Sequence, residues 1–457
     1  MVTKTAEVSE TMTTLSAHIA GAFGKPLPKE VTECAKLHLL DTLAAIVSGS
    51  RLIPGKRAIG YIKTLGGTRE ACVLGTRILT TAVNAALANG MFGHADETDD
   101  SHAAGLFHPG TCIVPAALAL AERNRYGGTA LLRAMVLGYD VGARLALALN
   151  PLKFFLRGHH TPSFGGLFGA AAAAGAMMRL NPERTRYLLS YTAQQAAGLA
   201  CLLRDPEHVE KAFDMAGMPA HNGVQAALFA AHGFTGVADV FSGDRNFFAA
   251  FAPDGDPARL VRELGKTYEI LNSSIKKWPV GAPILAPLDA LETLMQTHSF
   301  KASDVEKVVI TIAEKEAAIV NNRAAPDISL QHLVALMMVD GTVNFKSAHD
   351  FKRVRDPRVT RLKSCIELVG SAKMTDPLRR WHAKAEIKLR DGRMLKHYTN
   401  AARGSSYNPM SRKEENTKAL DLLAPVLGRR RGELLIDTVW NIENVTDVRA
   451  MRRLYCV

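Results

Sequence analysis

Long apolar runs are missing from this 457-residue chain, and no stretch reaches the roughly 18 residues that a membrane span requires. The first 21 residues include Lys4 but no apolar core like that of a secretory signal peptide. We therefore expect a protein with neither a membrane span nor a secretory leader.

Cysteine is scarce and scattered. The six cysteines lie far apart, and no two of them form a C-x-x-C pair; they are Cys34, Cys72, Cys112, Cys201, Cys365 and Cys456. This spacing is typical of buried free thiols in a reducing compartment. The sequence therefore predicts six free thiols and a cytoplasmic location.

Motifs for nucleotides and nucleic acids are also lacking. The chain has no G-x-G-x-x-G after a strand and no G-x-x-x-x-G-K-[ST], and no helix-turn-helix, zinc or RNP pattern. A net charge of +12 is compatible with nucleic acid, an acidic membrane face or an anionic substrate. Without those patterns, the basic clusters at 429–431 and 449–453 are interpreted as solvated surface. We expect no nucleic-acid partner and no membrane partner.

The length suggests two or three domains, and 47% hydrophobic with 22% charged residues is typical of a globular protein. From residue 28 to about 265 the apolar spacing predicts helices and no strand. The expected helices are Val31–Val47, Ala82–Met91, Pro115–Arg123, Gly128–Leu149, Gly165–Met178, Gln194–Leu203 and Ala220–His232. The fifth is almost entirely alanine and glycine, which predicts a helix at close approach to its neighbours.

The pattern then changes. Val305–Ile312 alternates and is rich in β-branched residues, which predicts a strand. Ala383–Leu389 and Met394–Tyr398 flank an Asp-Gly turn and predict a hairpin. Leu330–Asp340 and Asp356–Val369 are expected to be helical, as is Ser411–Leu427. The sequence thus predicts a mainly α protein, with a discontinuous helical domain at 1–266 and 402–457 and an α+β lid domain at 267–401.

Acids and histidines are densest at 94–102, which reads HADETDDSH, followed by FHPG at 107–110. Clustered carboxylates repel one another unless cations or hydrogen bonds hold them. One interpretation is a metal-dependent hydrolase, because His and Asp are good ligands. Its ligands would be His94, Asp99, Asp100 and His108, although their spacing matches no H-E-x-x-H motif. The other interpretation is a helix end and loop whose acids cap backbone N–H groups and pair with arginines.

Three further segments carry histidine or lysine. GHHTPSFG at 158–165 places two histidines before the small-residue helix, where a helix N-terminus attracts anions and an imidazole can move protons. SIKKWPVG at 274–281 places two lysines at the predicted domain junction, where a lysine beside a Trp-Pro turn could bind a carboxylate. Lys211 precedes GMPAHNG at 217–223. Each segment also has a structural interpretation, as a hydrogen-bonded loop histidine or a solvated lysine.

Together these segments resemble the MmgE/PrpD family, whose members include 2-methylcitrate dehydratase, cis-aconitate decarboxylase and iminodisuccinate epimerase. The similar segments are NG at 89–90 with HADETDDS at 94–101, HPG at 108–110 with VPAA at 114–117, GHH at 158–160 with GAA at 169–171, GFTG at 233–236, KKWP at 276–279, SLQ at 329–331 and NPMS at 408–411. They occur in the family's order over residues 30 to 411.

The resemblance implies a helical large domain with an α+β lid, a homodimer, an active site between the domains, and neither a metal nor an organic cofactor. It implies that the catalytic residues are His108, His160 and Lys276. The substrate-binding residues that it implies are Glu97, Asp96, Ser101, Lys211 and Lys277.

Three positions depart from the family pattern. Glu97 stands where the family has an aspartate, and Asp96 is the alternative for that role. The family's H-P-T reads His160-Thr161-Pro162 here, and Lys211 lies one residue from the family's spacing.

The implied activity is that of a cofactor-independent lyase acting on a small di- or tricarboxylic acid. A 2-methylcitrate dehydratase-like hydro-lyase is expected first, and a cis-aconitate-type decarboxylase or a dicarboxylate epimerase are the alternatives. These reactions pass through carbanion-like charge, which lysine and histidine cations stabilise once water is excluded. A family member that has lost activity and serves only in binding is a further alternative.

Overall fold

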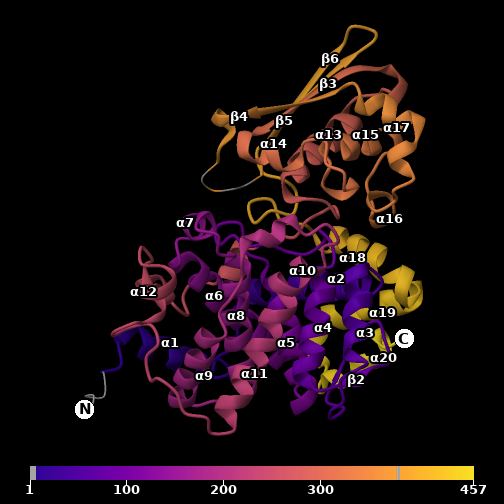
Figure 1. The fold of residues 1–457 in the computed structure, drawn as a ribbon. Helices are drawn as coiled ribbons and strands as arrows, with labels where there is room; N and C mark the ends of the chain where they lie inside the picture. Colours follow the sequence, from indigo (N-terminus) through magenta and orange to yellow (C-terminus); the bar gives the residue numbers. More distant parts are fainter. Residues whose placement is uncertain (1–6, 377, 379–380) are drawn as a thin grey trace. The chain divides into compact units, whose positions relative to one another are not determined.

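The computed structural model describes residues 7–376, 378 and 381–457, so the first six residues of the predicted helical domain lie outside the described residues. The mainly α fold class is confirmed, because this part of the chain holds twenty α-helices and six short strands (Figure 1). The chain divides into two compact units. Unit 1 comprises Met1–Ser273 with Leu422–Val457, and unit 2 comprises Ser274–Asp421.

Unit 1 is built almost entirely from helices. In chain order they are α1 (Glu10–Ala20), α2 (Lys29–Gly49), α3 (Ile53–Ile62), α4 (Ala82–Gly93), α5 (Pro109–Asn124), α6 (Gly128–Ala148), α7 (Pro151–Leu156), α8 (Thr161–Met177), α9 (Pro182–Gln194), α10 (Val209–Ala212), α11 (Met218–Ala231), α12 (Phe247–Phe251), α19 (Arg429–Trp440) and α20 (Arg452–Tyr455). Helix α18 (Arg412–Leu427) crosses the boundary between the units.

Helix α8 lies at the centre of unit 1, as its composition predicts. It packs against α5, α6, α9 and α11, and every one of its residues is buried. Small side chains allow this close approach. A Cβ on Gly142 of α6 would lie 2.6 Å from the backbone oxygen of Gly165 of α8, so only glycine fits there. The centre of unit 1 is therefore a tightly packed helical core.

Two expectations for this half of the chain are wrong. Gln194–Leu203 is not one helix, because α9 ends at Gln194 and only a 3-10 turn, η1 (Ala200–Arg204), follows. Gly198 between them has φ +140°, which breaks helical geometry. A short antiparallel pair, β1 (Ala71–Cys72) with β2 (Leu79–Thr80), also interrupts the helices. Strands of two residues are too short to show an alternating pattern in the sequence.

Unit 2 is an α+β unit. Its helices are α13 (Leu285–Thr297), α14 (Glu314–Val320), α15 (Leu330–Asp340), α16 (Phe345–Ala348) and α17 (Pro357–Lys363), and its strands are β3 (Val305–Ala313), β4 (Ile366–Ser371), β5 (Ala383–Leu389) and β6 (Met394–Thr399). The strand order is β4-β3-β5-β6, with β3 parallel to β4 and the other pairs antiparallel. Helices α13 and α15 pack against this sheet (Figure 1).

The predicted strand and hairpin of unit 2 are confirmed, and Gly392 in the turn has φ +89°. The helix expected at Asp356–Val369 is only half right. Helix α17 ends at Lys363, and strand β4 begins at Ile366 and pairs with β3. Tertiary pairing with β3 therefore overrides the local helical pattern.

The prediction of six free thiols is wrong for two of them. Cys72 and Cys456 form a disulfide across 384 residues of sequence. The fold brings them together because the C-terminal segment lies beside β1, where the Gly75 backbone N–H donates to the Tyr455 carbonyl oxygen at 2.8 Å. Sequence spacing cannot reveal a pairing that depends on this long-range contact. The free cysteines are Cys34, Cys112, Cys201 and Cys365.

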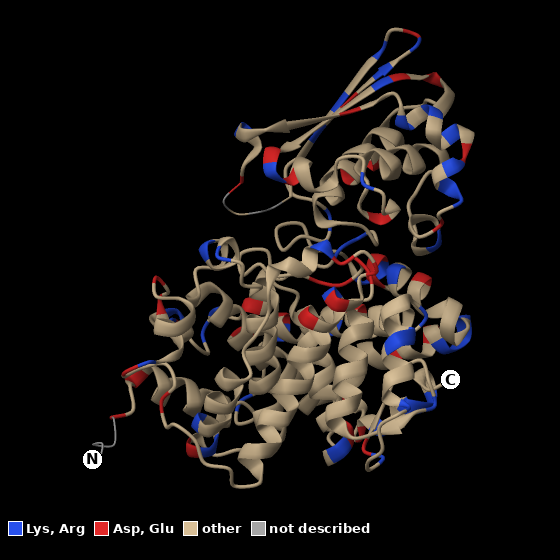
Figure 2. Ribbon diagram, in the orientation of Figure 1, with Lys and Arg blue, Asp and Glu red and all other residues tan. Residues whose placement is uncertain are grey.

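Charged residues lie mostly away from the central helices, and basic residues gather on α19 and α20 (Figure 2). Part of this positive charge is paired, since Arg429 contacts Glu433, Arg449 contacts Asp447 and Arg452 contacts Glu122. None of the helices in the described residues combines the length and the apolar character that crossing a membrane needs.

Candidate functional site

The histidines His94, His108 and His160 of unit 1 stand at helix ends. His94 is the C-terminal capping residue of α4, His108 precedes α5, and His160 precedes α8. Proline follows within the first two positions of α5 and α8, which fixes the backbone where each helix begins. Neither His108 nor His160 uses its side chain to cap its helix, so both imidazoles are available for other contacts.

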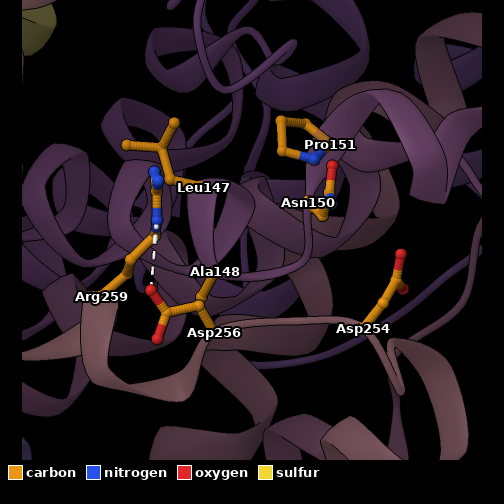
Figure 3. Close-up of a pocket in the computed structure, with 7 residues that line it drawn as sticks. All are labelled: Leu147, Ala148, Asn150, Pro151, Asp254, Asp256 and Arg259. Carbon is orange, nitrogen blue, oxygen red and sulfur yellow. Dashed lines mark ion pairs between the residues drawn. The ribbon is translucent and has the colours of Figure 1, made fainter.

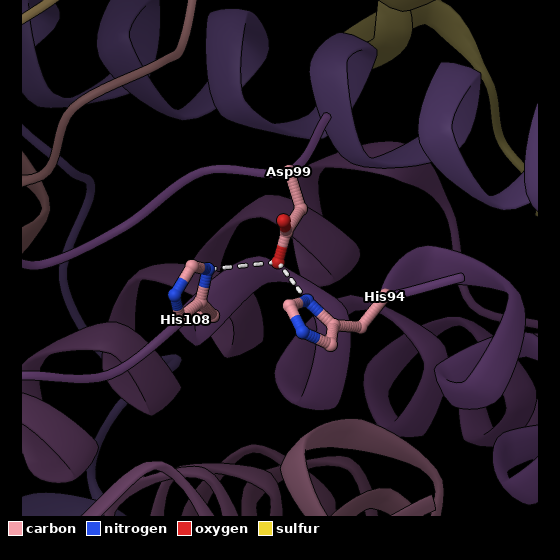
Figure 4. Close-up of side chains that lie close together, drawn as sticks. All are labelled: His94, Asp99 and His108. Carbon is pink, nitrogen blue, oxygen red and sulfur yellow. Dashed lines mark hydrogen bonds and ion pairs between the residues drawn. The ribbon is translucent and has the colours of Figure 1, made fainter. Parts of the chain in front are cut away.

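A single carboxylate oxygen joins two of these histidines. Asp99 Oδ2 lies 2.8 Å from His94 Nδ1 in a hydrogen bond (Figure 4). The same oxygen lies 2.9 Å from His108 Nδ1, at ion-pair distance but without the alignment of a hydrogen bond. Asp99 and His94 are buried, whereas His108 keeps 19% of its side chain exposed. Asp99 thus orients both rings and leaves the Nε2 atom of His108 as its other reactive nitrogen.

A third imidazole, that of His208, completes this cluster. The His208 ring lies 5.0 Å from the His94 ring, measured between centroids. Burial lowers the pKa of His94, and burial together with the charge of Lys211 lowers the pKa of His208 to about 3. Both rings are therefore neutral at physiological pH. His208 also has φ +62°, a left-handed conformation that is uncommon outside glycine.

Glu97 and Asp96 have different surroundings. Glu97 Oε1 lies 2.5 Å from Lys211 Nζ, across 114 residues of sequence. Asp96 accepts hydrogen bonds from the backbone and hydroxyl of Thr98, which closes a local turn. The structure thus gives Glu97 a direct contact with another candidate substrate-binding residue. Ser101 is buried, and its Oγ has no hydrogen-bond partner among the described residues.

Asp100 has a structural environment. Its carboxylate receives hydrogen bonds from Tyr139 Oη at 2.6 Å and the Gly110 backbone N–H at 2.9 Å, and contacts His38 Nδ1 at 2.7 Å. A Cβ on Gly110 would lie 2.8 Å from the Asp100 oxygen, so glycine is required there. This network connects the acidic loop to α2, α5 and α6. The contact with the Gly110 N–H is of the kind that the capping interpretation predicts, whereas the other two partners are side chains. The partners found for Asp99 and Asp100 are histidine and tyrosine side chains and a backbone N–H.

His160 forms a second carboxylate–histidine pair. Its Nδ1 contacts Asp214 Oδ2, and the Ser163 hydroxyl donates to the same oxygen at 2.5 Å. Both His160 and Asp214 are buried. Asp214 lies on η2 (Phe213–Gly217), a single π-helical turn between α10 and α11, a feature frequent at functional sites. His159, by contrast, stacks on Phe154 with ring centroids 4.6 Å apart.

The two carboxylate–histidine pairs belong to neighbouring elements. Cys112, in the first turn of α5, donates from Sγ to the Met215 carbonyl oxygen of η2 at 2.9 Å. A Cβ on Gly166, in the first turns of α8, would collide with Cys112. The N-terminal ends of α5 and α8 therefore lie side by side next to η2. Two helix N-termini with their partial positive charge favour an anionic ligand at this end of unit 1.

The two candidate lysines of unit 2 differ in their surroundings. Lys276 is completely buried. Lys277 pairs with Glu292 and lies over the Trp278 ring, with Nζ 4.7 Å from the ring centroid. These contacts give Lys277 a structural partner within unit 2.

The structure thus brings together, within unit 1, most of the residues singled out in the sequence. The sequence did not single out Asp214, which contacts His160, or His208, whose ring lies beside that of His94. Neither belongs to a recognisable motif, and the π-helical turn that positions Asp214 leaves no periodic signal in the sequence.

A separate pocket of about 220 Å³ lies at the end of α6 and the start of α7 (Figure 3). Its lining residues are Leu147, Ala148, Asn150, Pro151, Asp254, Asp256 and Arg259. The two carboxylates are paired, Asp256 with Arg259 and Asp254 with Arg157. None of the candidate site residues lines this pocket.

Comparison with known proteins agrees with the motifs. The chain is similar over 457 aligned residues to the cis-aconitate decarboxylase-like protein oryM of Aspergillus oryzae, with 24% identity over 94% of this chain and 93% of the relative. It is 25% identical to the cis-aconitate decarboxylase of Mus musculus, over 92% of this chain and 88% of the relative. For the cis-aconitate decarboxylase of Homo sapiens the identity is 24%, over 94% and 91%.

Family models cover most of the sequence. The MmgE/PrpD N-terminal domain matches residues 13–260, and the MmgE/PrpD C-terminal domain matches residues 278–442. The two matches follow each other in the family's order and leave only the ends and a short junction outside. The chain belongs to the MmgE/PrpD family.

Proposed function

We propose that this protein is a cofactor-independent lyase that acts on a small tricarboxylic acid, with decarboxylation of a cis-aconitate-like substrate as its reaction. The observation that carries the proposal is the pair of carboxylate-held imidazoles, Asp99–His108 and Asp214–His160, at two adjacent helix N-termini. This arrangement offers both proton transfer and attraction for an anion.

The substrate would bind through its carboxylates. Positive charge comes from the N-termini of α5 and α8 and from the Lys211 ammonium. Such charge attracts carboxylates. Lys211 is held by Glu97 in this structure, and we propose that a substrate carboxylate shares or replaces that contact. Lys276 is proposed as a further carboxylate-binding cation, as the family resemblance implies.

The proton would move through His160. Because Asp214 and Ser163 occupy the Nδ1 side of the ring, Nε2 is the nitrogen left to exchange a proton with substrate. A carboxylate at Nδ1 fixes the tautomer and stabilises the imidazolium form. Loss of CO2 leaves the bonding electron pair on the carbon skeleton, conjugated with a neighbouring carboxylate. Protonation of that carbon by His160 or His108 completes the reaction.

Decarboxylation is placed ahead of the dehydration expected from the motifs because the relatives carry that name. The three similar proteins described above are each named cis-aconitate decarboxylase or decarboxylase-like. The identity of 24–25% leaves the substrate to be determined, since pocket side chains decide it. Dehydration of 2-methylcitrate uses the same cations and imidazoles and is therefore the second candidate.

The experiment is a substrate screen with product identification. Purified protein is incubated separately with cis-aconitate, 2-methylcitrate, citrate and iminodisuccinate, and the products are identified by NMR. We expect release of CO2 and a five-carbon dicarboxylate from cis-aconitate. Turnover of 2-methylcitrate alone would move the function to dehydration, and turnover of none of the four would refute the proposed substrate class.

The sequence also left open a metal-dependent hydrolase. A metal-dependent hydrolase using His94, Asp99, Asp100 and His108 would need a free Asp100 carboxylate, but that carboxylate is already held by His38, Tyr139 and the Gly110 N–H. We therefore favour the lyase.

The homodimer implied by the family remains a prediction, and light scattering of the purified protein tests it.

A further inference from the structure

Another group of ligand atoms lies beside the Asp99 contact. His94, Glu97 and His208 each offer one nitrogen or oxygen atom, and these three atoms lie within 4.8 Å of one another. We propose that these three side chains form a binding site for Zn²⁺ or a chemically similar divalent cation. Two imidazoles and one carboxylate are a ligand set that zinc accepts, with one position left open.

Unpartnered nitrogen atoms support this site. His94 is 0% exposed, and its Nε2 has no hydrogen-bond partner among the described residues. The Nε2 of His208 is likewise buried and without a hydrogen-bond partner there. A buried polar atom without a partner is costly, and the rarity of such atoms in native proteins calls for an explanation. Two of them on rings whose centroids lie 5.0 Å apart point to a shared ligand.

Asp99 already has the position of a supporting residue for such a site. Its Oδ2 lies 2.8 Å from His94 Nδ1. This hydrogen bond places the proton of His94 on Nδ1 and the lone pair on Nε2. A carboxylate behind a histidine ligand is the usual arrangement at zinc, where it orients the ring and increases its basicity.

His94, Asp99 and His108 form a second group of possible ligands, but the distances between their atoms are less suitable for zinc. Ligand atoms around a tetrahedral zinc ion lie about 3.4 Å apart, because each bond is roughly 2.0–2.2 Å long. The Asp99 oxygen lies only 2.8 and 2.9 Å from the two Nδ1 atoms, which is the spacing of direct hydrogen bonding. The ligand atoms of His94, Glu97 and His208 lie within 4.8 Å of one another, close enough for rotation of the side chains to bring them onto one zinc ion.

Lys211 determines how metal binding would affect the enzyme. Its Nζ lies 2.5 Å from Glu97 Oε1, so the metal ion and the ammonium compete for one carboxylate. This consequence rests on the proposed function, in which Glu97 holds the Lys211 ammonium that receives a substrate carboxylate. A metal ion that takes Glu97 away from Lys211 displaces this ammonium and is therefore an inhibitor of the lyase and not a cofactor.

The test is a titration of chelator-treated full-length protein with Co²⁺, followed by the visible absorption that tetrahedral Co²⁺ shows. We expect about one Co²⁺ per chain, displaced by Zn²⁺. His208→Gln removes a ligand and should weaken Co²⁺ binding by at least about a hundredfold, more than loss of a supporting residue does. The matched control His298→Gln changes an exposed histidine of unit 2 and should bind as the wild type does.

A second variant keeps the test independent of the folding of His208→Gln. Lys211→Met removes the competing ammonium and should tighten Co²⁺ binding. Absence of Co²⁺ binding by the wild type, or equal affinity in the wild type and the folded His208→Gln variant, overturns the site. A Lys211→Met variant with unchanged or weaker affinity overturns the competition between metal and lysine.

Activity measurements separate the site from the proposed function. With cis-aconitate as substrate, Zn²⁺ should inhibit turnover, and a chelator should restore it. If Co²⁺ binds but none of the four substrates is turned over, the proposed function fails and the metal site stands. If turnover occurs and Co²⁺ does not bind, the metal site fails and the proposed function stands. If Zn²⁺ binds and turnover is unchanged, the proposed inhibition is wrong.

Discussion

Asp214 Oδ2 contacts Nδ1 of His160, although the two residues are 54 positions apart in the sequence. The contact is buried, and the Ser163 hydroxyl donates to the same oxygen. The Nδ1 edge of the imidazole is thereby fixed by two protein groups. In the proposed mechanism Asp214 is a positioning residue that acts through His160, because it sets the tautomer of the ring without touching the substrate.

Replacing Asp214 with asparagine should lower kcat by about tenfold to a hundredfold, the usual effect of losing a carboxylate behind a functional histidine. KM should stay near the wild-type value, because Asp214 positions His160 and does not contact the substrate. Steady-state kinetics, with the folded fraction checked by circular dichroism, measure both constants. A fall in kcat that only follows the loss of folded protein would indicate a purely structural role.

His160→Gln should reduce kcat by about two to four orders of magnitude with little change in KM, since the proposed proton transfer occurs in the transition state. Steady-state kinetics on the true substrate measure it. The neighbouring histidine gives a control, because His159 stacks on Phe154 and His159→Gln should keep kcat near the wild-type value. Wild-type kcat in His160→Gln would end the proton-transfer assignment.

The adjacent lysines of unit 2 should behave differently. Lys276→Ala should raise KM and lower kcat, because a cation that binds a carboxylate acts in the ground state as well as the transition state. Lys276→Arg keeps the charge but alters its geometry, so only partial recovery is expected. Lys277→Ala is the matched control, since Lys277 pairs with Glu292, and it should affect stability more than KM. Equal kinetic effects at both positions would argue against Lys276 as the substrate-binding lysine.

The contact between His38 and Asp100 should make stability depend on pH. Burial lowers the pKa of His38, but hydrogen bonds with Asp100 and Cys34 outweigh burial and raise it to about 10. In the unfolded chain the histidine pKa is about 6.5. Between these values the native state binds one more proton, so stability is complete below about pH 6.5 and is lost as pH rises towards 10, by at most about 1.4 kcal/mol per pH unit.

Denaturant unfolding at pH 6.5, 8 and 9.5 measures this slope. His38→Gln should flatten the dependence, whatever its effect on stability at pH 6.5. A wild-type free energy of unfolding that rises with pH over this interval would contradict the assigned charge of His38.

Much of the fold follows from sequence patterns. The alanine and glycine of residues 165–178 predict a central helix because their small side chains permit close packing, and α8 lies there. The Asp-Gly turn at 391–392 predicts the β5–β6 hairpin for a local reason. Strand β4 was missed because its residues become a strand through pairing with β3, which no local pattern records.

The candidate site shows the same division. His94, Glu97 and His108 stand in one short, unusually acidic segment and are visible in the sequence. Asp214 and His208 are not, since each is defined by a partner more than 50 residues away. The disulfide between Cys72 and Cys456 is an extreme case, because the two cysteines are 384 positions apart in the sequence. Motifs therefore single out candidate reactive residues, and only the fold shows which residues hold them.

In the proposed function, the acid–base residues of this chain convert a tricarboxylate without a metal. This function is tested most directly by incubating exhaustively chelated protein with cis-aconitate and following CO2 release and the product by NMR, with His160→Gln in parallel. The account predicts full turnover by the chelated wild type and a loss of about two to four orders of magnitude in the variant. Turnover that disappears on chelation and returns with added Zn²⁺ would contradict it.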